Sequence, residues 1–234
     1  MRGMNSELIV ALDLPNEELV DATLRALPEA VHWYKVGLEL FCTAGPAVLA
    51  RLQQRDKRIF LDLKLHDIPN TVAAAVHAAA GHRVDLLTVH ATGGAAMLKA
   101  AAEAAREHGT ERPQIIAVTT LTSLSHRDLK AIGVERDVSE QAIALGRMAL
   151  DCGIDGLVCS PLELEQLREA FGAEPILVTP GIRLADDQTD DQKRVATPET
   201  AVRLGADYLV VGRSLLNAPD PRATAERMLQ AIAG

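Results

Sequence analysis

The chain has 234 residues, a formal net charge of -8 at pH 7 and 48% hydrophobic residues. That length suffices for one large core, and no stretch rich in proline, glycine or serine divides the sequence. The acidic balance argues against nucleic-acid or membrane partners, and the polar first residues contain no apolar stretch typical of a signal peptide or membrane span. We therefore expect a soluble, cytoplasmic protein with a single domain over residues 1–234.

Eight short apolar runs rich in β-branched residues predict strands along the chain. In chain order these cover residues 8–14, 31–37, 58–65, 84–91, 114–121, 156–160, 175–179 and 207–212. Apolar residues at helical spacing lie between them, for example over 72–79 and 145–152 and, after the last strand, over 225–232. Ser160-Pro161-Leu162-Glu163 has the pattern of a capping box, and Thr197-Pro198 repeats its first two elements.

Eight strand–helix units in a chain of this length favour an α/β fold, the (β/α)8 or TIM barrel. A doubly wound open sheet is the main alternative. It would need a glycine-rich turn after an early strand, and Leu14-Pro15-Asn16-Glu17 after the first strand is not one.

The third expected strand carries charged residues that a buried strand seldom contains. Alternation places Asp62 and Lys64 on one face and the neighbouring leucines on the other, and Asp67 follows just past the strand end. Unpaired charges in an interior would cost several kcal/mol. A buried Asp–Lys pair that only stabilises the fold is the alternative to a catalytic site.

Polar residues also end most of the other strands, where a barrel has its active site. Taken singly each is more often a loop residue, but together they predict a ring around one mouth. The ring consists of Asp13, Lys35, Asp62, Lys64, Thr122, Arg183 and Arg213.

The last two strands end in sequences suited to a phosphate. Gly212-Arg213-Ser214 combines a glycine, an arginine and a following helix, and Gly181 and Arg183 follow the seventh strand. The alternative is that these glycines only turn the chain. The polar segment 184–194 between the two arginines predicts a lid that closes over the phosphate through Gln192, or else a disordered loop.

The three cysteines and seven histidines show no spacing typical of a metal site, so we expect no metal. No Gly-x-Gly-x-x-Gly motif or other cofactor site is evident either, so we expect no cofactor. Cys42, Cys152 and Cys159 all lie in apolar surroundings in the sequence, which favours core packing and agrees with a reducing compartment.

The segment Asp62 to Thr71, written Asp-x-Lys-x-x-Asp-Ile-Pro-x-Thr, resembles the signature of the orotidine 5'-phosphate decarboxylase family in its bacterial form. The resemblance covers essentially the whole chain. It implies a lyase that decarboxylates orotidine 5'-phosphate to UMP in pyrimidine biosynthesis, without a cofactor and as a homodimer with shared active sites.

The resemblance also implies a role for each matching residue. Lys64 would donate the proton, Asp67 and Thr71 would reach the neighbouring subunit's site, and Ser125 is a looser match near the base. The implied catalytic set is Lys35, Asp62, Lys64 and Asp67, and the substrate-binding set is Asp13, Lys35, Asp62, Thr71, Thr122, Ser125, Arg183, Gln192, Gly212 and Arg213.

Two other functions stay open at this point. A metal-dependent sugar-phosphate synthase or aldolase of the same superfamily, such as 3-hexulose-6-phosphate synthase, is similar in Asp-x-Lys-x-x-Asp, although Ile68 to Thr71 favours the decarboxylase. A non-catalytic barrel that binds a nucleotide phosphate would keep Arg183 and Arg213 but would not need both lysines and both aspartates.

Overall fold

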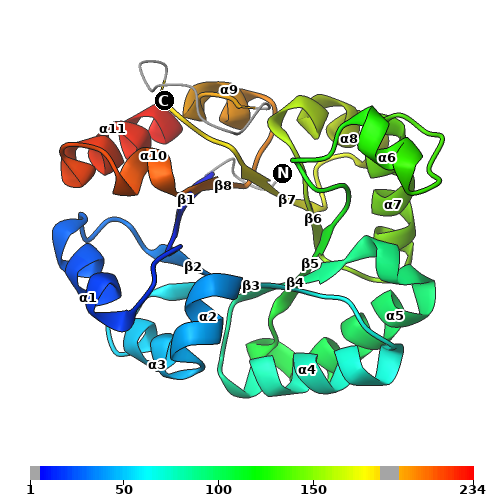
Figure 1. Ribbon diagram of the computed structural model, residues 1–234, viewed down its shortest axis with the longest axis horizontal. Helices are drawn as coiled ribbons and strands as arrows, with labels where there is room; N and C mark the ends of the chain where they lie inside the picture. The colour runs from blue at the N-terminus through cyan, green and yellow to red at the C-terminus, as the bar shows by residue number, and fades with distance from the viewer. Residues whose placement is uncertain (1–5, 185–194) are drawn as a thin grey trace.

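The computed structural model describes residues 6–184 and 195–234, in which eight parallel strands close into a barrel (Figure 1). Each strand pairs with the next, and β8 pairs with β1. This confirms the (β/α)8 prediction and excludes the open sheet. The strands are β1 (Glu7–Ala11), β2 (Trp33–Gly37), β3 (Arg58–Leu65), β4 (Leu86–His90), β5 (Gln114–Val118), β6 (Gly156–Val158), β7 (Ile176–Pro180) and β8 (Tyr208–Val211).

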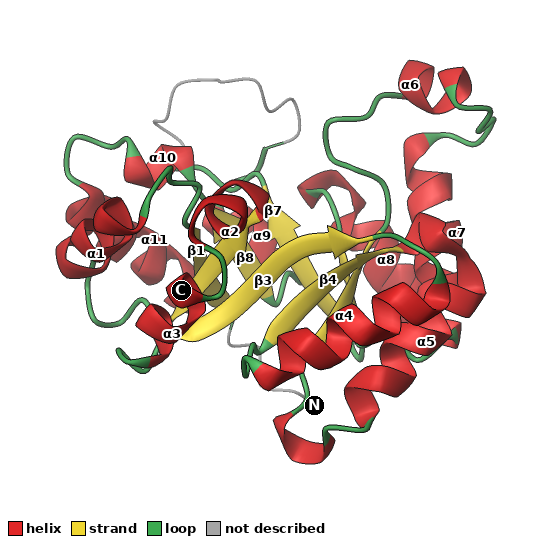
Figure 2. Cartoon of the chain, turned by 60° about the horizontal axis from the view of Figure 1, so that its bottom comes forward, coloured by secondary structure: helices red, strands yellow, loops and turns green. Residues whose placement is uncertain are grey.

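Helices surround the barrel, and α6 projects from the rest of the chain on long connections (Figures 1 and 2). None of the described helices is long and apolar enough to cross a membrane. The α-helices are α1 (Glu17–Ala26), α2 (Leu38–Ala44), α3 (Ala47–Gln53), α4 (Pro69–Gly81), α5 (Gly94–Arg106), α6 (His126–Ala131), α7 (Val138–Asp151), α8 (Leu164–Phe171), α9 (Pro198–Arg203), α10 (Arg213–Leu216) and α11 (Pro221–Ala233). Three 3₁₀ turns lie at Ala91–Gly93, Gly109–Glu111 and Pro161–Glu163.

Both predicted helix starts are confirmed, with one difference in helix type. Ser160 and Glu163 form the reciprocal bonds of a capping box, but they begin the 3₁₀ turn Pro161–Glu163, and α8 follows it. Thr197 caps α9 by accepting a hydrogen bond from the Thr200 N–H. These side chains satisfy backbone N–H groups that a helix leaves free at its start.

Alternation along the strands divides the core into two layers, as expected of a barrel. One layer fills the barrel interior, and the other packs the outer faces of the strands against the helices. The interior layer consists of Ile9, Ala11, Trp33, Phe60, Leu86, Ile116, Ile176, Val178 and Val210. The next inward positions toward the carboxyl ends of β2 and β3 are Lys35 and Asp62, so the charged residues lie directly above this apolar floor.

One expectation about packing is wrong. Cys152 and Cys159 are buried as predicted, but Cys42 is exposed on α2. Its apolar sequence neighbours Leu40 and Phe41 face the barrel side of this short helix, and Cys42 lies on the other side, toward solvent.

Candidate active site

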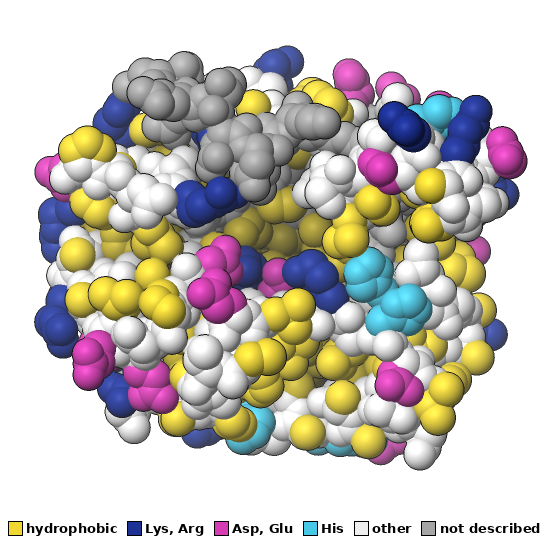
Figure 3. All heavy atoms as spheres, viewed as in Figure 1, with side chains coloured by type: hydrophobic (Ala, Val, Ile, Leu, Met, Phe, Trp, Pro, Cys, Tyr) yellow, Lys and Arg dark blue, Asp and Glu magenta, His cyan; other side chains and the backbone are white. Residues whose placement is uncertain are grey.

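A cavity of about 260 Å³ opens at the carboxyl ends of the strands. Phe60, Val118, Val158, Val178 and Val210 form its apolar wall and floor. Figure 3 shows this face of the molecule, with a hydrophobic hollow at its centre and acidic and basic side chains along its edge. All the predicted ring residues line the cavity, and so does Gly212 of the phosphate candidates; the ring residues are Asp13, Lys35, Asp62, Lys64, Thr122, Arg183 and Arg213.

Four of these residues form a continuous chain of alternating charges across β1, β2 and β3. Lys35 Nζ lies 2.9 Å from Asp13 Oδ1 and 3.5 Å from Asp62 Oδ2. Lys64 Nζ donates to the same Asp62 Oδ2 at 2.8 Å. Two ammonium groups therefore share one carboxylate oxygen, which places a second positive charge near the Lys64 ammonium.

Asp62 stays ionised in this surrounding. Burial is the largest influence and raises the pKa of the Asp62 carboxyl, because it disfavours a charge. The charges of Lys35 and Lys64, with hydrogen bonds from Lys64 and Thr88, outweigh burial and hold that pKa below its ordinary value. The carboxylate can thus keep both lysines oriented at neutral pH.

The backbone at Lys64 departs from regular strand geometry. Its φ is +51°, in the left-handed region, and the pairing of β3 with β4 shifts register between Leu61 and Leu65. A left-handed conformation is unfavourable for a residue with a side chain, and such strain is often found at functional sites. Asp62 and Lys64 still share one face as alternation predicted, but the strand is not regular at that point.

Thr88 on β4 connects the backbone and side chains of this charged segment. Its hydroxyl accepts from the Lys64 N–H at 2.8 Å and donates to Asp62 Oδ1 at 3.0 Å. Thr88 is fully buried. Sequence reasoning missed this residue, although a lone threonine in the apolar run Leu86–His90 was an available signal.

Gly37 at the end of β2 was also missed. A Cβ atom added there would lie 2.8 Å from Lys35 Nζ and 3.1 Å from Asp13 Oδ1. The absence of a side chain at Gly37 therefore leaves space for the Lys35–Asp13 pair. A glycine at a strand end was visible in the sequence, but its contact depends on the position of Asp13 on another strand.

Asp67 and Thr71 lie apart from the four-residue network. Asp67 lies just before α4, and Thr71 lies in its first turn. Both are exposed, and neither lines the cavity. Asp67 accepts a hydrogen bond from the Ile68 N–H at 2.7 Å, and it makes no ion pair with any described residue. The adjacent Ile68 side chain is 66% exposed.

The β5 side of the mouth holds the residues matched to the base. Thr122 lines the cavity, whereas Ser125 caps α6 through a reciprocal capping box with Asp128 and does not line it. Thr120 also lines the cavity, and its buried hydroxyl has no hydrogen-bond partner in the described part of the chain.

The β7 and β8 ends bring the phosphate candidates to the same cavity. Arg183, Gly212, Arg213 and Ser214 all line it. The Ser214 hydroxyl donates to the Ile182 carbonyl at 3.4 Å, which joins the two loops. Residues 185–194, which include Gln192 and most of the expected lid, lie outside the described residues.

Within residues 6–184 and 195–234, no three His, Cys, Asp or Glu side chains are arranged to hold a metal ion. The cavity therefore combines a charged network on β1 to β3, arginines on β7 and β8, and an apolar floor between them. Such a site can hold an anion at one end and stabilise developing negative charge at the other.

Comparison with known proteins agrees with the resemblance over nearly the whole chain. A protein from Nostoc sp. (strain PCC 7120 / SAG 25.82 / UTEX 2576) named orotidine 5'-phosphate decarboxylase is 48% identical, over 97% of this chain and 98% of its own. One of the same name from Bacillus cereus (strain AH820) is also 48% identical, covering 93% of each chain.

A solved structure and a family model match equally broadly. The crystal structure of orotidine 5'-phosphate decarboxylase from Lactobacillus acidophilus matches with a TM-score of 0.87 and 40% identity, covering 98% of this chain and 100% of that one. The model described as "Orotidine 5'-phosphate decarboxylase / HUMPS family" matches residues 6–228. The chain therefore belongs to the orotidine 5'-phosphate decarboxylase / HUMPS family.

Proposed function

We propose that this chain decarboxylates orotidine 5'-phosphate to UMP, with Lys64 stabilising and then protonating the carbanion at C6. The observation that carries the proposal is the arrangement of Lys35, Asp62 and Lys64 at one side of a cavity whose other side holds two arginines. Relatives of that name at 48% identity support the same activity.

The reaction breaks the bond between C6 and the carboxylate carbon, and the electron pair stays on C6 while CO2 leaves. No ring carbonyl delocalises this pair well, so electrostatic stabilisation must lower much of the barrier. The Lys64 ammonium favours the developing charge and then gives its proton to C6. Asp62 holds that ammonium in place through the 2.8 Å contact.

The remaining cavity residues bind the other parts of the nucleotide in this proposal. Asp13 and Lys35 hold the ribose, Thr122 contacts the pyrimidine, and Ser125 is a more distant contact on the same side. The phosphate is bound by Arg183, Gly212 and Arg213 with Gln192, which lies outside the described residues. Binding energy gained at this remote group helps to orient the pyrimidine against Lys64.

Asp67 and Thr71 complete the site of a second subunit in this proposal, which makes the working form a homodimer. Their exposed position supports this role, because Asp67 has no cationic partner among the described residues. The neighbouring exposed Ile68 side chain supplies apolar surface suited to an interface. The unpaired cysteines, with Cys42 exposed, agree with a cytoplasmic location as part of the same proposal.

Mixing two inactive variants tests the shared site. Lys64→Ala and Asp67→Ala homodimers are each expected to be crippled, whereas a mixed dimer has one site with both residues intact. Refolding the two together in equal amounts should restore about a quarter of all sites in a symmetric dimer. If subunit exchange is demonstrated and activity stays at the level of the separate variants, Asp67 acts within its own chain.

Release of CO2 from orotidine 5'-phosphate tests the activity itself. We expect turnover that survives excess EDTA, since the proposed chemistry uses only side chains. Full dependence on an added divalent metal would favour the sugar-phosphate synthase or aldolase. Binding of UMP without any turnover would favour the non-catalytic barrel.

A further inference from the structure

The Thr88 hydroxyl occupies a position between two parts of the catalytic segment. It accepts from the Lys64 backbone N–H at 2.8 Å and donates to Asp62 Oδ1 at 3.0 Å. A hydroxyl has one proton to donate, and here that proton goes to the carboxylate. Lys64 Nζ and Lys35 Nζ contact the other carboxylate oxygen, Oδ2. Thr88 therefore holds Oδ1 of the Asp62 carboxylate, the oxygen that neither lysine contacts.

The Thr88 hydroxyl also binds the backbone of β3. The ladder between β3 and β4 is irregular between Leu61 and Leu65, and Lys64 has a φ of +51°. A residue in this strained region needs surrounding contacts that hold it there. The bond from the Lys64 N–H to Thr88 supplies such a contact, because it gives a partly buried backbone donor a partner at the point where the ladder shifts.

We propose that Thr88 is a positioning residue for the Lys64 ammonium, which it controls by holding the Lys64 backbone and orienting the Asp62 carboxylate. This inference rests on the proposed function of Lys64 in decarboxylation. Thr88 lies on β4 at an inward position below the cavity and is not among the residues that line it. Its effect on the reaction therefore passes through Asp62 and Lys64 and not through the substrate.

Substitutions at Thr88 can separate its hydroxyl from its packing. Thr88→Ser keeps the hydroxyl and loses the methyl group, and Thr88→Ala loses both, so this pair differs only in the hydroxyl. We expect kcat of Thr88→Ala to fall about 10- to 100-fold below that of Thr88→Ser, because small displacements of a reacting group are costly. KM for orotidine 5'-phosphate should change by less than about threefold in both, since the substrate contacts stay in place.

Thr119→Val is the matched control for a lost buried hydroxyl. Thr119 lies just after β5, is 1% exposed and donates to the Val158 carbonyl at 3.1 Å, without contact to the charged network. Its loss should lower the melting temperature and leave kcat within about twofold of the parent. Equal kcat in Thr88→Ser and Thr88→Ala, or an equal fall in kcat in Thr119→Val, would overturn the proposal.

A readout independent of turnover separates this inference from the proposed function. In a crystal structure of Thr88→Ala we expect Lys64 to leave the left-handed region or its ammonium to move from Asp62 Oδ2. An unchanged Lys64 conformation with an unchanged contact would refute the positioning role even if the parent is fully active. An inactive parent whose Lys64 moves in the variant would refute the proposed function and leave the positioning role standing.

Discussion

Charged clusters occupy both ends of this barrel, and they differ in how their charges are satisfied. At the amino-terminal end, an aspartate directly before β4, β6 and β8 accepts a hydrogen bond from a backbone N–H of the preceding strand. Each also pairs with an arginine. The pairs are Asp85 with Arg58, Asp155 with Arg112, and Asp207 with Arg168.

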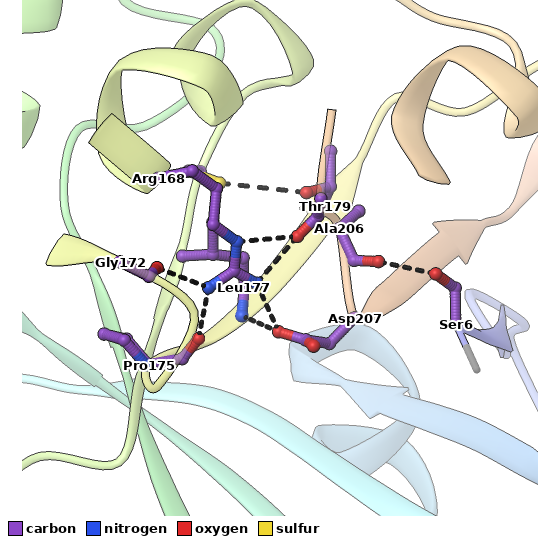
Figure 4. Close-up of polar contacts among 10 residues, drawn as sticks. Ser6, Arg168, Gly172, Pro175, Leu177, Thr179, Ala206 and Asp207 are labelled. Carbon is purple, nitrogen blue, oxygen red and sulfur yellow. Dashed lines mark hydrogen bonds and ion pairs between the residues drawn. The ribbon is translucent and has the colours of Figure 1, made fainter. Parts of the chain in front are cut away.

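Figure 4 shows one of these pairs and its backbone partners. Arg168 donates to Asp207 Oδ2 and to the Pro175 carbonyl, each at 2.8 Å, and the Leu177 N–H donates to the same aspartate oxygen at 2.7 Å. In this pair each charged side chain therefore has an oppositely charged partner and a further hydrogen bond to the backbone of a regular strand or its flanking turn. This arrangement ties β7 to β8 and stabilises the fold.

At the mouth, the same types of residue are arranged differently. Lys35 and Lys64 share one oxygen of Asp62, and Lys64 adopts a left-handed backbone conformation. Two positive charges therefore lie close together at one carboxylate oxygen, where they repel each other. The comparison teaches that pairing at the amino ends serves stability, whereas the crowding at the carboxyl ends is what the proposed reaction requires, at a cost in stability.

The largest effect that distinguishes the two ends is expected for Lys64→Ala. Its kcat should fall by at least about a thousandfold, because the ammonium that stabilises charge at C6 is lost. UMP binding, measured by calorimetry, should stay largely intact, since the product carries no charge at C6. Near-normal turnover would refute the role of Lys64.

At the amino-terminal end, Asp207→Ala should destabilise the fold and leave catalysis unchanged. It leaves the buried Leu177 N–H without its acceptor and removes the ion pair with Arg168. We expect a loss of about 1–3 kcal/mol in the free energy of unfolding, measured with urea, and a parental kcat well below the melting temperature. Asp151→Ala, at the exposed end of α7, is the control and should change stability by less than about 0.5 kcal/mol. A large loss of kcat in Asp207→Ala would remove the distinction between the ends.

The strain at Lys64 predicts an unusual order of stability among its variants. Lys64→Gly should be more stable than Lys64→Ala by about 0.5–1 kcal/mol, because glycine adopts a positive φ freely. Lys35, in a regular part of β2, supplies the opposite comparison, and there Ala should be more stable than Gly. If Lys64→Gly is the less stable of its pair, the left-handed conformation is not a strain on the fold.

The smallest effect is expected at acid pH, in the contribution of Asp62 to the free energy of unfolding. Since the folded state holds the pKa of Asp62 below its ordinary value, the carboxyl contributes stability above the unfolded pKa of about 3.9. That contribution is lost as the pH falls through the lower folded pKa. The difference in unfolding free energy between the parent and Asp62→Asn should therefore shrink on acidification below about pH 4. A difference that grows there would contradict the direction of the shift.

Much of this protein was predictable from local pattern. The eight apolar runs predicted the eight strands. The run 114–121 is a strand only as far as Val118, and its later residues Thr120 and Leu121 line the cavity. Polar residues at the strand ends predicted the ring around the cavity, because all carboxyl ends of a parallel barrel meet at one side. All the ring residues line that cavity, together with Gly181, Gly212 and Ser214 of the phosphate candidates. The positions of these residues are confirmed, but their roles stay predictions, as do those of Asp67, Thr71, Ser125 and Gln192.

Sequence alone determined that Asp62 and Lys64 face the same way, because alternation along one strand is a local property. Only the tertiary structure placed the Thr88 hydroxyl between them, the Lys35 ammonium on the shared oxygen of Asp62, and Gly37 against the Lys35–Asp13 pair. Each of these contacts joins neighbouring strands of the barrel, so each depends on strand register. Register follows from how the whole barrel closes, and a local pattern of residues does not specify it.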